Sequence, residues 1–319
     1  MYLTNYLNQV NKVIQVITLL IFFYSGGLLM AAPATGKVVI INSDTNINKY
    51  QQAEAAFKQE LQKNPVQIIN LNLDSNANSE NLLKQINEIN PDLIYSIGSK
   101  AYQLVDQANT GKPLLFSSVI NWQRFNLNPN THGVANELSL AQELSFLGYL
   151  LPNARRIGVI YDPRYSQQRI NEARDYAKQL GITLEEAKID GTSTAIDLLD
   201  NLLPKIDLLW LIADPGVLTD KATIEAIYKQ TEQMHKPIYT YSEAFINYGA
   251  SLIVAADTPT IGRQAATMAE AILRHEPITS NVQAAAGSHI ILNTCQMHKI
   301  KADYNADALE SVNQIIDCH

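Results

Sequence analysis

The stretch KPIYTYSEAFINYGASLIVAADTPTIGRQ, residues 236–264, decides the fold of this chain. It contains two short apolar runs, and each ends in polar residues: the first in Tyr241-Ser242-Glu243, the second in Asp257. Thr258-Pro259 then predicts the N-cap and first residue of a long helix. Strand ends with carboxylates and hydroxyls beside a helix N-terminus are the usual ligand-binding positions of open α/β sheets. The stretch therefore predicts one wall of a ligand-binding cleft.

The same alternation of a buried strand and a helix runs through the whole chain. Strands that are almost entirely apolar favour parallel sheets with helices on both faces. Residues 92–117 and 207–241 also resemble each other, since each has a strand, a polar strand end, a helix, then Lys-Pro and a second strand. We therefore expect two Rossmann-like α/β lobes. Toward the C-terminus we expect a helix over 258–274, a loop, a strand over 289–293 and a final helix near 306–316.

Composition restricts the possible partners. The chain has 319 residues, a formal net charge of −7 and a pI of about 5.4. The length allows about two domains. No basic run is visible, which argues against binding to nucleic acid. The two cysteines, Cys295 and Cys318, form either one disulfide bond, if the protein is exported, or two unpaired thiols.

The N-terminus has the features of a secretory signal peptide over residues 1–34. An apolar run from Val13 to Tyr24 is broken by Ser25-Gly26-Gly27, and Ala32-Pro33-Ala34 offers a cleavage site. The alternative is an uncleaved membrane anchor, because the uncharged segment is long enough to span a bilayer. We expect a periplasmic or secreted protein.

Polar residues at the predicted strand ends suggest a zwitterionic ligand. Serine hydroxyls near helix N-termini suit a carboxylate, and Asp or Glu side chains suit an ammonium group. Tyr161, Tyr241 and Phe245 are candidates to pack an apolar ligand side chain. The candidate carboxylate ligands are Ser99, Ser117 and Ser118, and the candidate ammonium ligands are Asp214, Glu243 and Asp257.

Each of these residues has a structural alternative. Asp214 precedes Pro215 and Asp257 precedes Thr258-Pro259, so both carboxylates also suit a turn or a helix cap. Glu137 either contacts the ligand or complements the dipole of the helix that follows it.

Catalytic and cofactor motifs are absent from the sequence. There is no GxGxxG after the first strand, no Walker loop and no GxSxG, and none of the six histidines has zinc-ligand spacing. We therefore predict no catalytic residue, no metal and no cofactor.

Three phrases carry a resemblance to a known family: YSEAF at 241–245, ADTPTIGRQ at 256–264 and GSHIILN at 287–293. The chain resembles the ABC-transporter substrate-binding proteins related to the tryptophan- and aromatic-amino-acid-binding lipoproteins. Many of these relatives are lipoproteins, but no cysteine follows the apolar run here. We therefore expect a freely diffusing form.

The resemblance implies a type I periplasmic-binding-protein fold with two lobes joined by three crossings, near Asn136–Leu138, Val254–Asp257 and Gly287. Lobe 1 would comprise residues 36–137 plus 255–286, and lobe 2 residues 138–254 plus 287–319. The resemblance also implies a set of cleft-lining residues. These are Ser99, Ser117, Ser118, Asn136, Asp214, Tyr241, Ser242, Glu243 and Asp257.

The function expected from these features is that of a monomeric receptor for an ABC importer, which binds an amino acid or similar small molecule and delivers it to a membrane permease. Two alternatives remain open. One is an extracytoplasmic sensor with the same fold. The other is a periplasmic hydrolase that uses Glu137 or Glu243 together with Asp257.

Overall fold

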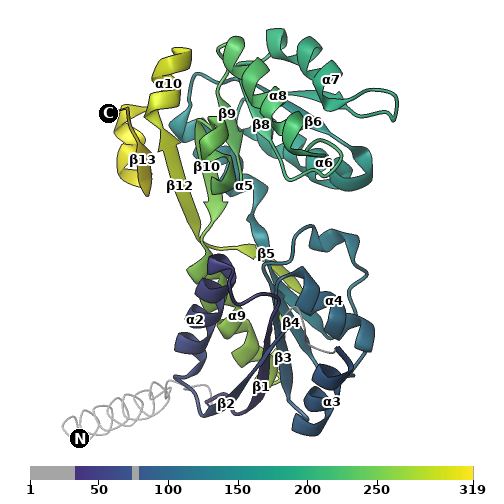
Figure 1. Cartoon of the computed structure of the whole chain (residues 1–319). Coiled ribbons are helices and arrows are strands. Elements are labelled where there is room, and N and C mark those ends of the chain that lie inside the picture. The colour runs from purple at the N-terminus through teal and green to yellow at the C-terminus, as the bar shows by residue number, and fades with distance from the viewer. Residues whose placement is uncertain (1–32, 74–78, 319) are drawn as a thin grey trace, which may run out of the picture. The chain divides into compact units, whose positions relative to one another are not determined.

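The computed structural model describes residues 33–73 and 79–318, so that almost all of the predicted signal peptide lies outside it. The described strands form two separate sheets, each with helices packed on it (Figure 1). Within this part of the chain, no helix combines the length and the apolar character needed to cross a membrane.

The first sheet has the strand order β11-β5-β4-β3-β1-β2, and all of its pairings are parallel. Its central strands are buried on both faces, which explains their nearly continuous apolar sequences. The strands are β1 (Gly36–Asn42), β2 (Val66–Asn72), β3 (Leu93–Ile97), β4 (Leu114–Ser117), β5 (Thr131–Leu138) and β11 (Val282–Ala285).

Alternate residues of β1 pack against different helices, because successive side chains of a strand point to opposite faces. Val38 and Ile40 share a core with α2 and α9, whereas Val39 and Ile41 share one with α3 and α4. Figure 1 shows α2 and α9 together on one face of this sheet. Gly262 of α9 permits their close approach, since a Cβ there would lie 2.3 Å from a backbone carbonyl of α2. The helices are α2 (Asn48–Leu61), α3 (Ser79–Ile89), α4 (Ser99–Ala108) and α9 (Thr258–Leu273).

The second sheet has the order β13-β12-β10-β9-β8-β6-β7. Its pairings are parallel except that between β10 and β12, which is antiparallel. The strands are β6 (Arg156–Tyr161), β7 (Thr183–Lys188), β8 (Leu208–Leu211), β9 (Ile238–Thr240), β10 (Leu252–Ala256), β12 (Ser288–Asn293) and β13 (Gln314–Ile316).

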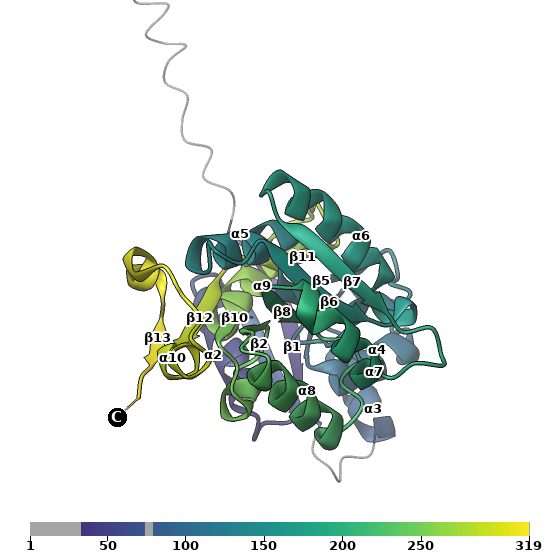
Figure 2. The same cartoon turned by 90° about the horizontal axis from the view of Figure 1, so that it is seen from above.

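Helices cover both faces of this sheet as well. Figure 2 shows α5 and α6 on one side of its strands and α7 and α8 on the other. Leu208 and Trp210 of β8 pack toward α5 and α6, and Leu209 and Leu211 pack toward α7 and α8. The helices are α5 (Leu140–Leu150), α6 (Pro163–Gln179), α7 (Ala195–Leu202), α8 (Lys221–Gln233) and α10 (Thr294–Ile300). The short 3-10 helices are η1 (Trp122–Arg124), η2 (Leu203–Lys205), η3 (Glu243–Tyr248) and η4 (Ala306–Ser311).

The described chain passes between the two sheets three times: from β5 to α5, from β10 to α9 and from β11 to β12. The backbone N–H of Asp257 donates to the carbonyl of Gly287 at 2.9 Å, so the second and third crossings are bonded to each other. The prediction of two α/β lobes joined by three crossings is confirmed. The residue limits given above for the two lobes stay a prediction.

Three local predictions were wrong. Asp257, not Thr258, is the N-cap of α9, since its side chain accepts a hydrogen bond from the backbone N–H of Thr260. The region predicted as a final helix instead forms η4 and the edge strand β13. The loop predicted after α9 contains β11, which extends the first sheet beside β5. Both strands are short, at four residues or fewer, and the sequence pattern of so short a strand is weak.

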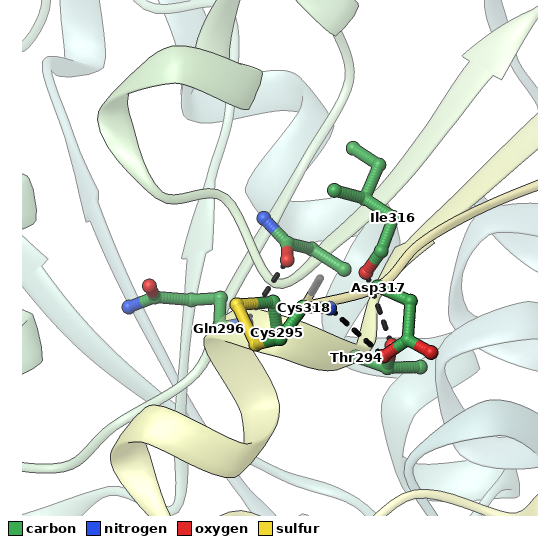
Figure 3. The surroundings of a disulfide bond; sticks show 7 residues. Thr294, Cys295, Gln296, Ile316, Asp317 and Cys318 are labelled. Carbon is green, nitrogen blue, oxygen red and sulfur yellow. Dashed lines mark hydrogen bonds between the residues drawn. A yellow bond between two sulfur atoms is a disulfide. The ribbon is translucent and has the colours of Figure 1, made fainter.

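Cys295 and Cys318 form a disulfide bond, which decides between the two alternatives left open by the sequence (Figure 3). It joins the start of α10 to the chain just after β13. The hydroxyl of Thr294 reinforces this link by donating to the carbonyl of Ile316 and to Oδ1 of Asp317, each at 3.0 Å. The C-terminal edge strand is therefore held to the second sheet by a covalent bond as well as by backbone pairing.

We expect the Cys295→Ser/Cys318→Ser variant to lose about 2–3 kcal/mol of unfolding free energy, because a cross-link that closes a 23-residue separation restricts the unfolded chain. Urea denaturation of the oxidised wild type and the double variant measures this loss. Hydrogen exchange should also be faster at residues 314–316, and unchanged exchange there would contradict the role of the bond in holding β13.

Candidate ligand-binding site

The residues predicted to bind the ligand follow the carboxyl ends of strands in both sheets. Ser117 ends β4, and its carbonyl accepts from the N–H of Gly98 at 2.9 Å, so the ends of β3 and β4 are adjacent. In the second sheet, Leu211 of β8 is in register with Thr240 of β9. Asp214 and Tyr241 therefore follow neighbouring strands. Asp257 and the exposed Asn136 lie at two of the crossings.

The three serines of the first sheet have different environments. The Ser117 hydroxyl is buried and hydrogen-bonded to the Tyr95 hydroxyl at 2.6 Å, so its side chain is engaged inside the lobe. Ser118 is buried and has a left-handed backbone, with φ of 56°. Ser99 is the first residue of α4, and its hydroxyl accepts from the N–H of Ile120 at 3.2 Å. Ser99 and Ser118 thus shape the loop that follows β4.

The turn before α4 depends on Gly98. Its φ of 87° is a conformation that L side chains rarely adopt, and a Cβ would lie 2.7 Å from the Ser43 hydroxyl. That hydroxyl accepts from the N–H of Ala101 at 2.9 Å and so satisfies one free N–H in the first turn of α4.

Asp214 makes structural contacts of the kind that were the alternative to ligand binding, and its role toward a ligand stays a prediction. The residue is buried, and its carboxylate accepts from the backbone N–H of Asp162 at 2.9 Å and of Gly216 at 2.8 Å. Both oxygens therefore hold the loops that follow β6 and β8.

Asp257 is likewise engaged within the chain. Its Oδ2 accepts from the backbone N–H of Thr260 at 2.9 Å and from the hydroxyl of the same residue. Arg263 lies 3.7 Å from that oxygen. The carboxylate caps α9, as the alternative reading of the sequence proposed.

The segment after β9 presents three polar groups in sequence. Tyr241 packs edge-on against Phe245, with ring centroids 5.6 Å apart. Burial, with a smaller contribution from the charge of Glu137, raises the pKa of the Tyr241 hydroxyl to about 12. Ser242 caps η3 by accepting from the N–H of Ala244. Glu243 is partly exposed and lies 3.9 Å from Lys49.

An ionic cluster of Glu137, Glu143 and Arg169, in which Glu143 is buried and the other two are partly exposed, was not predicted. Glu143 is 4% exposed, and Nη2 of Arg169 donates to both of its carboxylate oxygens at 2.6 Å. The guanidinium of Arg169 also lies 5.9 Å from the centroid of the Trp210 ring. A signal for this pair exists in the sequence, because Glu143 and Arg169 fall at helical spacing among the buried residues of α5 and α6.

Glu137 is the third member of this cluster and lies in β5 at the first crossing. Its Oε2 atom is buried and has no hydrogen-bond partner. Burial raises the pKa of the Glu137 carboxyl to about 7, and the Glu143 charge adds to this shift, whereas the Arg169 charge and hydrogen bonds from the backbone of Asn136 and Glu137 oppose it. Glu137 therefore gains and loses a proton near neutral pH.

Comparison with known proteins identifies the family. Residues 36–316 match the family model described as ABC transporter substrate binding protein, and the chain belongs to this family. A tyrosine-binding protein of Clostridioides difficile (strain R20291) is 24% identical over 227 residues, which are 66% of this chain and 65% of the relative. The match thus spans slightly less than two thirds of that relative's length.

Solved structures share the fold. A ligand-free, open substrate-binding protein with adhesive properties from Clostridium difficile has a TM-score of 0.69 and 19% identity, covering 89% of this chain and 100% of the other. An ABC domain in complex with L-Trp from Streptococcus pneumoniae has a TM-score of 0.57 and 18% identity, covering 89% and 100%. The resemblance to the family of ABC-transporter substrate-binding proteins is confirmed.

Proposed function

We propose that this substrate-binding protein is the extracytoplasmic receptor of an ABC importer and that its ligand is an aromatic amino acid. The observation that carries the proposal is the family match over residues 36–316, combined with polar strand ends in both sheets. The names of two similar proteins, one called tyrosine-binding and one in complex with L-Trp, support the choice of ligand.

The proposed site draws on both sheets. Ser99 and Ser118, beside the N-terminus of α4, would bind the ligand carboxylate. Glu243 would contribute negative charge toward the ammonium group, and Tyr241 would pack against the aromatic ring. Ser117, Asp214, Ser242 and Asp257 would position this site through the hydrogen bonds described above, and Asn136 would lie beside it at the first crossing.

Contacts to both lobes at once would favour a closed arrangement that the membrane permease recognises. We also propose that residues 1–34 direct export and are removed, leaving the receptor free to diffuse.

We expect L-tyrosine or L-tryptophan to bind the purified protein, and Glu243→Ala to weaken this binding about tenfold through loss of a charge–charge interaction. Isothermal titration calorimetry measures both affinities. Glu225→Ala is the matched control, since Glu225 is also a partly exposed carboxylate paired with a lysine, Lys221, at 3.5 Å. Equal losses in both variants would argue against a site at Glu243. Absence of binding to either amino acid would overturn the proposed ligand class.

A further inference from the structure

The carboxylates at the strand ends differ in how many of their oxygens accept hydrogen bonds from the protein. Both oxygens of Asp214 and Oδ2 of Asp257 accept hydrogen bonds from backbone N–H groups of loops and a helix N-terminus. Glu243 is partly exposed and lies near Lys49. Among the carboxylate oxygens of the described residues, Oε2 of Glu137 alone is buried without a hydrogen-bond partner. A buried acceptor in this state costs free energy that a suitable donor would recover.

The neighbouring charges leave Glu137 without a dedicated cation. Arg169, on α6, directs its Nη2 donor to both oxygens of Glu143, on α5. Tyr239 of β9 completes this group by donating from its hydroxyl to the Glu143 carbonyl at 3.4 Å. When all three charged groups are ionised, two carboxylates face one guanidinium. The cluster then carries one uncompensated negative charge.

The position of Glu137 is suited to contact with a ligand. The residue lies at the first crossing between the sheets and remains partly exposed, although its Oε2 atom is buried. Tyr241 follows the carboxyl end of β9, and the Glu137 charge contributes to the raised pKa of its hydroxyl. An ammonium group beside Glu137 would thus have an aromatic side chain within reach.

We propose that Glu137 receives the ammonium group of the ligand, which satisfies its Oε2 atom and balances the charge of the cluster formed with Glu143 and Arg169. This inference rests on the proposed function, because it requires a ligand with an ammonium group. It adds Glu137 as a residue that recognises the ligand. The direct contact with the ammonium group is then made by Glu137, and Glu243 acts on that group electrostatically from a longer distance.

Proton exchange follows from this arrangement. The raised pKa of Glu137 means that the ligand-free protein carries a proton there over part of the population at neutral pH. A bound cation favours the ionised carboxylate and lowers its pKa, so binding releases a proton. Affinity therefore increases as pH rises through about 7, where the ligand-free carboxyl loses its proton without help from the ligand.

The test is calorimetric titration of the full mature protein with L-tyrosine and L-tryptophan, in phosphate and in Tris buffer at the same pH. We expect release of about half a proton per ligand near pH 7, and affinity roughly tenfold higher at about pH 8 than at about pH 5.5. Glu137→Gln keeps the size of the side chain and should abolish both effects. Glu225→Gln, on the exposed face of α8, is the matched control and should retain them.

Each outcome decides between the claims. Binding without proton release in the wild type, or an unchanged pH dependence in Glu137→Gln, would overturn this inference and leave the proposed function standing. If Glu137→Gln does not fold, the proton release measured for the wild type still tests this inference. If neither amino acid binds, both the proposed function and this inference are wrong.

Discussion

Arg169→Ala is expected to lower the free energy of unfolding by about 4 kcal/mol, because it leaves the Glu143 carboxylate buried without its cation. Arg169 donates to both oxygens of Glu143, and Glu143 is almost fully buried in α5. The change also removes the charge that opposes the pKa shift of Glu137. Urea denaturation at neutral pH, followed by circular dichroism, measures the loss.

The double variant Arg169→Met/Glu143→Met is the control for this prediction. It removes both charges while keeping most of the side-chain volume, and replacement of a buried ion pair by apolar residues is often close to neutral. We therefore expect the double variant to be more stable than Arg169→Ala. If the two variants lose equal stability, the cost arises from packing and not from an unpaired charge.

Asp214→Ala is expected to cost about 3 kcal/mol, since two backbone N–H groups, those of Asp162 and Gly216, would lose a charged acceptor. Asp214→Asn keeps one acceptor oxygen and should lose roughly half as much. Thermal and urea unfolding measure both variants.

A ligand titration of the same variants separates structure from recognition. If Asp214→Ala unfolds like the wild type but no longer binds L-tyrosine or L-tryptophan, Asp214 contacts the ligand, as the sequence alone suggested. A larger loss of stability in Asp214→Ala than in Asp214→Asn supports the structural role.

Sequence reasoning was strong where a pattern extends over a whole element. Val38–Ile41 and Leu208–Leu211 are apolar because helices cover both faces of each sheet, and that pattern predicts parallel α/β lobes without any contact being known. The capping box at the start of α5, formed by Ser139 and Gln142, is likewise a local arrangement, since it involves only four consecutive residues.

The direction of a polar side chain at a strand end could not be predicted in the same way. Ser117 ends one buried strand and Asp214 follows another. Their partners are Tyr95 on the neighbouring strand and the backbone N–H of Asp162 after β6. These partners are distant in sequence, so no local pattern reveals whether a hydroxyl or carboxylate is free. Helical spacing places Glu143 and Arg169 among buried residues, but it does not show that they pair, since they lie on different helices 26 residues apart.

The Cys295–Cys318 bond has a practical consequence for recombinant production. Glutathione and thioredoxin keep cytoplasmic thiols reduced, so material made in that compartment would have a loosened C-terminus. Protein directed to an oxidising compartment, or reoxidised after purification, is the appropriate sample for calorimetry. Without the disulfide, heat from rearrangement of the C-terminal segment would add to the heat of ligand binding.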